Sequence, residues 1–395
     1  MPTSVASALA TWLAAITPLP AERLAAAEAL GRTLVDDVVA PGDLPAFARS
    51  MMDGYAVRRA WAGQEVALAA ARHAGDDASL ALPLDQAMPI MTGAVVPQGA
   101  EAVVPRELVE RTASGVRLPA VIAARANIVD IGAEARRGAT VLRAGTMIGP
   151  LALAALIALD VPTVLVRRRP QVAIRTTGSE LCAAGPLALG AIRDSNGPML
   201  AAMFSELGQV AERSSIGDDA DALAALIRGN SAELLVLTGG VSAGDKDHVP
   251  AVLRDLGAEV LVQGVDQKPG KPLLLARLDG RLVAALPGNP LAVHWCCTAF
   301  LAPALRALAG LPTIARRVRV DLGAALPGSK ERPWFVPCAI TADGRAQPLL
   351  PASSADVVGP ATISGYASVA AGAAPLPAGA PIDLLLCGAA AWTCA

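Results

Sequence analysis

The sequence predicts a multidomain α/β plus β protein, and three observations support this fold class. Between residues 170 and 310, apolar strand-like runs alternate with helically spaced segments, which is typical of a mostly parallel sheet covered by helices. Short apolar runs without helical spacing lie before and after this region. The 395 residues exceed one ordinary domain, and 31 prolines with 36 glycines favour many turns over a long helical bundle.

The N-terminal third predicts a β-rich module inserted between helical segments. Thr3–Ala15 has the pattern of an amphipathic helix, and Ala21–Leu30 is expected to form a second one after two prolines. Short runs such as Val66–Ala71, Pro89–Ile90 and Ala102–Val104 then alternate with Gly, Pro and Asp, as in a β-domain.

The chain is expected to return to helix after Asn127, and Pro150 is suited to the first turn of a helix carrying Leu151–Leu159. We therefore predict a discontinuous helical linker domain, residues 1–33 and 127–167, around an inserted β-rich domain, residues 34–126.

The central region, residues 168–311, is predicted to be an α/β domain. Apolar runs and helical spacing predict the following order of elements: a strand at Gln171–Arg175, a helix at Pro198–Leu207, a strand at Leu234–Leu237, a helix at Val249–Leu256, and a hairpin at Leu273–Leu286. The hairpin turns at Asp279-Gly280, a pair that suits a type I′ turn. Alternation from Val318 to Leu386 predicts a C-terminal β-barrel-like domain, residues 312–395.

Composition argues against several classes of protein. A net charge of −2 offers no basic face for nucleic acid, and the lone run Arg167–Arg169 is interpreted as solvated. The most apolar stretch, Leu151–Val166, is interrupted and too short to span a membrane. No signal-peptide pattern begins the sequence, so a cytoplasmic location is expected. Six cysteines without a CxxC pair and three separated histidines argue against a zinc site.

Three glycine-containing loops follow predicted strands: Thr177–Glu180, Thr238–Asp245 and Leu286–Pro290. In an open α/β sheet, ligands bind beyond the carboxyl ends of the strands. Glycine lets backbone N–H groups approach a phosphate because no Cβ intervenes. Each loop alone could equally be a tight turn, but three at strand ends favour an anionic ligand.

A proline-stiffened loop with two lysines, Gln267–Pro272, precedes the hairpin. Lysine is a compact charge suited to a phosphate or oxyanion, although a pair of solvated surface lysines is the alternative. Carboxylates form a second group, and near phosphate loops they suggest Mg²⁺, which takes one or two carboxylates together with phosphate oxygens. Asp245 could instead cap a helix and Asp218 form a turn. The candidate carboxylates are Asp53, Glu180, Asp218, Asp245 and Asp247.

These segments, in this order, resemble the molybdopterin molybdenumtransferase family, which includes bacterial MoeA and the gephyrin E domain. The resemblance spans roughly residues 21–310, and only Arg332 and Ser353-Ser354 match beyond it. The matching segments are Ser50–Ala56, Met91–Ala94 with Pro97 and Gly99, Thr177–Leu181, Asp194–Asn196, Gly239–Asp247, Lys268–Pro272 and Leu286–Pro290.

The resemblance implies an architecture that agrees with the predicted domains, and a homodimer whose active sites lie between two chains. It also implies a reaction in which molybdate replaces the AMP of adenylylated molybdopterin with the help of Mg²⁺. A separate molybdopterin adenylyltransferase would supply the substrate, and molybdoenzymes would receive the product.

The resemblance also assigns roles to residues. Asp53 and Thr92 would come from the partner chain and act in catalysis with Glu180 and Asp247, and the metal would be held by Glu180, Asp245 and Asp247. Lys268 and Lys271 would bind oxyanions, and Asp218 would contact the pterin or the nucleotide. The full predicted binding set is Thr177, Gly178, Ser179, Asp218, Gly239, Gly240, Ser242, Gly244, Lys268, Lys271, Pro287, Gly288, Asn289 and Pro290.

Four residues depart from the family pattern: Ser179, Val129, Ala133 and Glu134 stand where aspartate, arginine, glutamate and aspartate are usual. Losing an arginine removes a cation from a site that handles anions, and Arg136 or Arg137 could replace it. Two alternatives therefore stay open: a weakened paralogue that binds or carries the cofactor, or a dimeric scaffold. A generic nucleotide-binding protein lacks support because neither GxxxxGK[ST] nor GxGxxG occurs in the right context.

Overall fold

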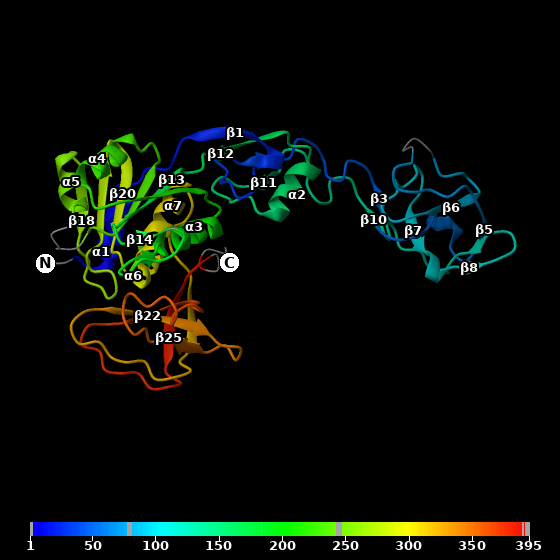
Figure 1. Ribbon diagram of the computed structural model, residues 1–395. Coiled ribbons are helices and arrows are strands. Elements are labelled where there is room, and N and C mark those ends of the chain that lie inside the picture. The colour runs from blue at the N-terminus through cyan, green and yellow to red at the C-terminus, as the bar shows by residue number, and fades with distance from the viewer. Residues whose placement is uncertain (1–2, 77–80, 183, 242–246, 389–390, 392–395) are drawn as a thin grey trace. The chain divides into compact units, whose positions relative to one another are not determined.

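The structure is a computed structural model that describes residues 3–76, 81–182, 184–241, 247–388 and 391. The chain divides into two compact units. Unit 1 consists of Met1–Glu22, Gly31–Thr33 and Arg167–Ala395, and unit 2 of Arg23–Leu30 and Leu34–Val166. Unit 1 contains the α/β sheet and the C-terminal β-sheet, and unit 2 contains a separate β-sheet (Figure 1).

A six-stranded mixed sheet forms the centre of unit 1, in the order β16-β13-β17-β20-β19-β18. The first four of these strands pair in parallel, and β19 pairs antiparallel with both of its neighbours. The predicted hairpin is confirmed, and its turn residues Asp279 and Gly280 have φ of 49° and 77°, as a type I′ turn requires. The strand bounds are β13 Val172–Thr177, β16 Ala211–Ile216, β17 Leu234–Thr238, β18 Glu259–Gln263, β19 Leu274–Leu278 and β20 Arg281–Leu286.

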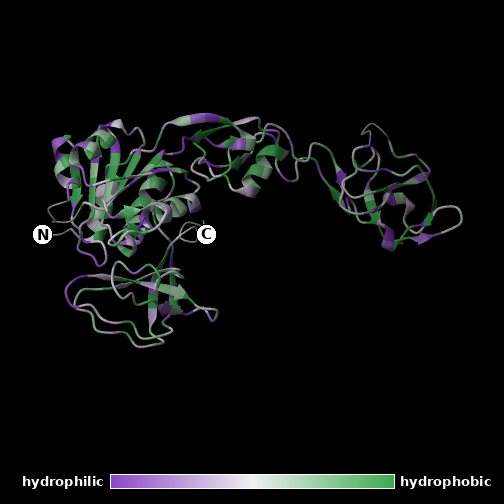
Figure 2. Ribbon diagram, viewed as in Figure 1, coloured by the Kyte–Doolittle hydropathy of each residue, from purple (hydrophilic) through white to green (hydrophobic). Residues whose placement is uncertain are grey.

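Helices cover both faces of this sheet because successive strand residues point to opposite sides. Val172 and Ile174 belong to one core, with α1 (Val5–Ala14), α3 (Asn196–Glu206) and the run α6 (Pro290–Cys296), η4 (Cys297–Leu301) and α7 (Ala302–Leu308). Ala173 belongs to the other core, with α4 (Ala220–Gly229) and α5 (Val249–Asp255). The strands between these layers are coloured mainly as hydrophobic in Figure 2.

One helical run in the described part of the chain, Pro290–Leu308, is long and apolar enough to cross a membrane. Its most apolar window is 89% buried within the fold, and Trp295, Phe300 and Leu305 pack into the core of unit 1. A buried apolar helix is typical of a protein core, and we interpret this one in that way.

The C-terminal part of unit 1 is a five-stranded antiparallel sheet in the order β21-β25-β24-β22-β23. This agrees with the predicted β-barrel-like domain, and its inward residues, such as Val336 and Leu384, form a separate core. The strand bounds are β21 Arg317–Asp321, β22 Trp334–Ile340, β23 Ala346–Pro348, β24 Gly365–Val369 and β25 Pro381–Leu386. A short parallel pair, β14 (Leu181–Cys182) and β15 (Ile192–Arg193), completes the described strands of unit 1.

Unit 2 is built around a sheet in the order β7-β4-β6-β5-β9-β8, with smaller pairs β10-β3, β11-β2 and β1-β12. Its helix α2 (Pro150–Ala158) begins at the predicted proline. The strand bounds are β1 Ala21–Ala25, β2 Val38–Val39, β3 Arg49–Ser50, β4 Gly54–Val57, β5 Glu65–Leu68, β6 Gln86–Ile90, β7 Ala102–Pro105, β8 Glu110–Arg111, β9 Val116–Arg117, β10 Ile128–Val129, β11 Thr140–Leu142 and β12 Thr163–Arg167. Single 3₁₀ turns lie at Ala26–Glu28, Arg59–Trp61 and Arg106–Leu108.

The prediction of a helix at Ala21–Leu30 is wrong. Ala21–Ala25 forms β1, which pairs with β12, and a 3₁₀ turn follows. The expected return to helix directly after Asn127 is also wrong, because β10 and β11 precede α2. Alanine is a strong helix former, but intrinsic helix propensity amounts to less than about 1 kcal/mol per residue, and pairing with the distant strand β12 overrides it.

Candidate active site

A cleft of about 1500 Å³ opens in unit 1 where β13, β17 and β20 end. Segments of the C-terminal domain, including Gly328–Arg332 and Pro351–Ala355, form part of its lining. The structure brings together at this cleft the following predicted residues: Thr177, Gly178, Glu180, Asp218, Gly239, Gly240, Asp247, Lys268, Lys271, Pro287, Gly288, Asn289 and Pro290. The predicted residues Ser242, Gly244 and Asp245 lie outside the described residues.

The described glycines of the first two loops have positive φ, and one of them, Gly239, also packs closely against backbone. Gly239 has φ of 89°, and a Cβ there would lie 2.6 Å from the carbonyl oxygen of Thr177. The Thr177 hydroxyl donates to the carbonyl of Thr238 at 3.1 Å, which ties the two loops together. A Cβ on Gly178 would lie 2.7 Å from each carboxylate oxygen of Glu180. The second loop therefore packs against the end of the first through backbone at Gly239, where there is no room for a side chain.

Ser179 does not line the cleft directly but binds Asp218, which does. The backbone N–H and the hydroxyl of Ser179 donate to Asp218 Oδ2 at 3.2 and 3.0 Å. The Asp218 N–H donates back to the Ser179 hydroxyl at 3.3 Å. Ser179, which stands where aspartate is usual in the family, thus orients the carboxylate of Asp218 at the cleft.

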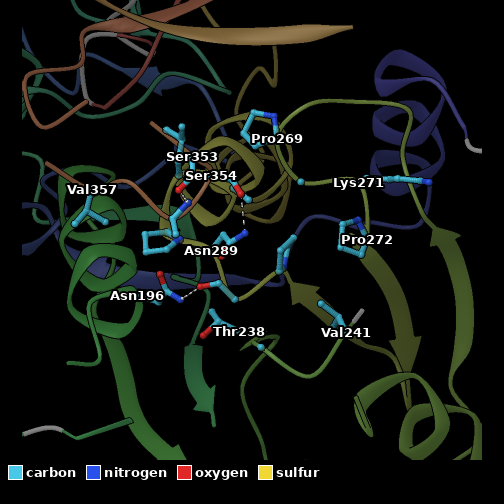
Figure 3. A pocket seen from close by; sticks show the side chains of 18 of the residues that line it. Asn196, Thr238, Val241, Pro269, Lys271, Pro272, Asn289, Ser353, Ser354 and Val357 are labelled. Atoms are coloured by element: carbon cyan, nitrogen blue, oxygen red, sulfur yellow. Dashed lines mark hydrogen bonds between the residues drawn. The ribbon is translucent and has the colours of Figure 1, made fainter. Parts of the chain in front are cut away.

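Amide and hydroxyl groups connect the third loop to its neighbours (Figure 3). Asn196 donates from Nδ2 to the carbonyl of Gly288 at 2.7 Å, and Asn289 donates to the Ser354 hydroxyl at 2.7 Å. Asp194 accepts bonds from the Thr176 hydroxyl and the Gly197 N–H, both at 3.0 Å. The bond to Ser354 joins the α/β domain to the C-terminal domain at the wall of the cleft.

The lysine loop is supported by buried polar and aromatic groups. Gln267 is fully buried, accepts a bond from Trp295 Nε1 at 2.7 Å, and donates to the carbonyl of Gly270 at 2.8 Å. Lys268 places its ammonium 4.2 Å from the ring centroid of Trp334. Lys271 is exposed and lines the same cleft, so the loop contributes two lysines to the lining.

Two described carboxylates of the predicted metal set, Glu180 and Asp247, line the cleft. Within the described residues, no group of three or more His, Cys, Asp or Glu lies close enough to hold a metal ion. Mg²⁺ needs one or two protein carboxylates together with phosphate oxygens and water. Glu180 and Asp247 together supply the number of carboxylates that such an ion needs, and a phosphorylated ligand would have to complete its shell.

Asp53 and Thr92 lie together in unit 2, in loops next to β4 and β6. The backbone N–H and the hydroxyl of Thr92 donate to Asp53 Oδ1 at 2.9 and 2.8 Å, and Arg106 lies 4.0 Å from Oδ2. The N–H bond, then the hydroxyl bond and more weakly the arginine charge hold the pKa of Asp53 below its ordinary value. The neighbouring Gly54 is structural, because a Cβ there would lie 2.2 Å from the Val104 carbonyl oxygen.

The segment that departs from the family pattern pairs with β3. Val129 lies opposite Arg49, and the Arg49 side chain forms an ion pair with Glu134. Arg137 donates from its backbone N–H to Asp43 at 2.8 Å. A cation is thus present on the strand facing Val129, although the sequence directed attention to Arg136 and Arg137.

Trp334 and Arg193 are among the cleft residues that sequence reasoning missed. Gln267 lies within the predicted lysine loop, but its role as a buried support for that loop was not predicted. Trp334 and Arg193 carry no local signal, because each reaches the cleft only through tertiary packing.

Comparisons with known proteins agree with this geometry. A family model described as "MoeA N-terminal region (domain I and II)" matches residues 3–159, and one described as "Probable molybdopterin binding domain" matches residues 173–307. A molybdopterin molybdenumtransferase of Staphylococcus aureus (strain COL) is 33% identical over 303 residues, covering 74% of this chain and 72% of the relative. A molybdopterin molybdenumtransferase of Staphylococcus epidermidis is 33% identical over 294 residues, covering 72% of this chain and 70% of the relative.

Solved structures of the molybdopterin biosynthesis MoeA protein from Pyrococcus horikoshii share the fold. One is 27% identical with a TM-score of 0.79, covering 98% of this chain and 99% of the relative. Another is 24% identical with a TM-score of 0.81, covering 98% of this chain and 100% of the relative.

Proposed function

This chain belongs to the molybdopterin molybdenumtransferase (MoeA) family of molybdenum cofactor biosynthesis, and we propose that it exchanges the AMP of adenylylated molybdopterin for molybdate in a Mg²⁺-dependent reaction. The observation that carries this proposal is the convergence on one cleft of about 1500 Å³ of three strand-end loops, of Lys268 and Lys271, and of the predicted carboxylates Glu180, Asp218 and Asp247. A cleft of that size suits a ligand as large as a pterin joined to a nucleotide.

In this proposal the cleft binds anions through backbone and cationic groups. Gly178, Gly239 and Gly240 let backbone approach the pyrophosphate, since none presents a Cβ. Lys268 and Lys271 bind oxyanions, either those of the pyrophosphate or those of molybdate. Asp218, oriented by Ser179, accepts hydrogen bonds from the pterin or the nucleotide.

Glu180 and Asp247 would hold the magnesium ion, with Asp245 as a third candidate outside the described residues. The ion would supply positive charge that lowers the cost of releasing AMP as a leaving group. The Glu180 side chain has no hydrogen bond or ion pair with any described residue, which is consistent with a carboxylate reserved for a ligand or ion.

The active form would be a homodimer in which Asp53 and Thr92 of a second copy complete the site. The exposed Thr92 and the half-exposed Asp53 support this part of the proposal, because their bonds to each other hold a carboxylate at the surface of unit 2. A separate adenylyltransferase would supply the substrate and molybdoenzymes would take the product, with all of them in the cytoplasm.

The test is AMP release by the purified chain, given adenylylated molybdopterin and Mg²⁺, with and without molybdate. We expect molybdate-dependent release that Glu180→Ala abolishes. Full activity in that variant would contradict the role of Glu180. Tight pterin binding without any release would instead favour a carrier, and Val129, Ala133 and Ser179 would then be the first residues to revert.

A further inference from the structure

The loop that carries Lys268 is bonded to the first residues of β22 in the C-terminal domain. The Lys268 N–H donates to the carbonyl of Pro333 at 2.8 Å, and the Phe335 N–H donates to the carbonyl of Lys268 at 2.8 Å. These two bonds place Lys268 beside Trp334 in a parallel bridge. The C-terminal domain therefore sets the position of this part of the loop.

Side chains on β22 alternate between the cleft and the core. Trp334 lines the cleft, and its ring lies 4.2 Å from the Lys268 ammonium. Phe335 stacks on the buried Trp295, with centroids 3.8 Å apart and planes at 16°. Trp295 in turn donates to Gln267, which adjoins the lysine. Trp334 thus contacts Lys268 directly, and Phe335 supports its neighbour Gln267 through Trp295.

An aromatic partner has a different effect on a lysine from that of a carboxylate. A carboxylate would neutralise the ammonium, whereas a ring face attracts the cation through its quadrupole and leaves its charge available. The Lys268 side chain forms no ion pair with any described residue. Contact with the ring also restricts a flexible four-carbon side chain, whose freedom an anion would otherwise have to remove on binding.

We propose that Trp334 is a positioning residue that presents the charged Lys268 ammonium to an oxyanion in the cleft. The inference rests on the proposed function, since it needs an oxyanion at Lys268. That oxyanion is either molybdate or the pyrophosphate of the adenylylated pterin, which share the same chemistry.

The experiment measures AMP release by the full chain while each substrate is varied in turn, in Trp334→Leu, Trp334→Phe, Lys268→Ala and the double variant. Trp334→Leu should raise the half-saturating concentration of one substrate about three- to tenfold with little change in kcat. The substrate affected identifies the oxyanion. Trp334→Phe keeps an aromatic ring, so it should raise the half-saturating concentration less than Trp334→Leu does.

The double variant separates positioning from general structure. If Trp334 acts through the lysine, Trp334→Leu should add less than about twofold once Lys268 is alanine. Trp61→Leu is the matched control, because Trp61 also faces a cation, the Arg58 guanidinium at 5.9 Å, and lies in unit 2. It should leave both half-saturating concentrations unchanged.

Two results would overturn the inference: unchanged half-saturating concentrations in Trp334→Leu, or equal effects with and without Lys268. Calorimetric binding of inorganic molybdate and of AMP to the same variants keeps the test independent of turnover. A chain that releases no AMP, yet binds one of these anions more weakly in Trp334→Leu, would refute the proposed function and support the inference. Unchanged binding of both anions in Lys268→Ala would refute the inference, whereas the proposed function would still be decided by AMP release.

Discussion

Gly239→Ala offers a direct test of how the strand-end loops are packed. Gly239 has φ of 89°, and a Cβ there would lie 2.6 Å from the Thr177 carbonyl oxygen and 2.7 Å from the Thr177 hydroxyl oxygen. The carbonyl belongs to the backbone at the end of β13, so it cannot rotate away as a flexible side chain could. Gly257 is a matched control, since its φ is 78° and nothing lies within 4 Å of its Cβ position.

The two variants share one energetic cost and differ in another. Positive φ costs an alanine about 1–2 kcal/mol, and both glycines have it. The contact with Thr177 adds an overpacking cost of about 1–3 kcal/mol, which only Gly239 bears. We therefore expect Gly257→Ala to lose about 1–2 kcal/mol of unfolding free energy and Gly239→Ala about 2–5 kcal/mol.

The assay is denaturant unfolding of unit 1, followed by the fluorescence of the buried Trp12 and Trp295, together with AMP release. Gly239→Ala should also impair AMP release, because the displaced loop lines the cleft, whereas Gly257→Ala should leave it unchanged. Equal losses of stability in the two variants would refute the packing argument. Full AMP release by Gly239→Ala would refute the link between this loop and the site.

Three further predictions concern ionisable groups. Burial lowers the pKa of His294 from 6.5 to about 4, so the unfolded chain takes up a proton first as the pH falls. Stability should therefore drop by up to about 3 kcal/mol between pH 6.5 and 4, and His294→Gln should flatten that part of a stability–pH curve. Ser179→Asp would place a second carboxylate against Asp218, and AMP release should then depend more steeply on Mg²⁺ concentration. Thr92→Val should raise the pKa of Asp53 only part of the way to its ordinary value, because the backbone N–H bond remains, as carboxyl NMR titration would show.

Each of these predictions has an outcome that contradicts it. A stability–pH curve of the same slope in His294→Gln would show that this group does not titrate with folding. An unchanged Mg²⁺ dependence in Ser179→Asp would mean that the new carboxylate points away from Asp218. An unshifted titration in Thr92→Val would show that the hydroxyl does not act on Asp53.

The grouping of the strand-end loops could be predicted from the sequence. The loops after β13, β17 and β20 follow apolar runs, and parallel strands place their carboxyl ends at one edge of a sheet. The hairpin turn at Asp279-Gly280 was equally predictable, because its backbone demands positive φ at both residues.

Other features depended on contacts between distant parts of the chain. Ala21–Leu30 is alanine-rich and suggests helix, yet its first five residues pair as a strand with β12. Ser179 gave no reason to expect a bond to Asp218, since the two loops meet only in the folded sheet. Arg49 likewise became visible as the residue facing Val129 only through the pairing of β3 with β10.

The sequence by itself determined the family motifs and the chemical types present at the site, because both depend on local composition and spacing. Only the tertiary structure decided which neighbours orient the site residues. Ser179 orients Asp218 through hydrogen bonds, and Trp334 and Gln267 lie beside Lys268. The physical reason is that hydrogen bonds and ring contacts act over a few ångströms in space, and nothing in the spacing of residues along a chain records which distant segments will meet.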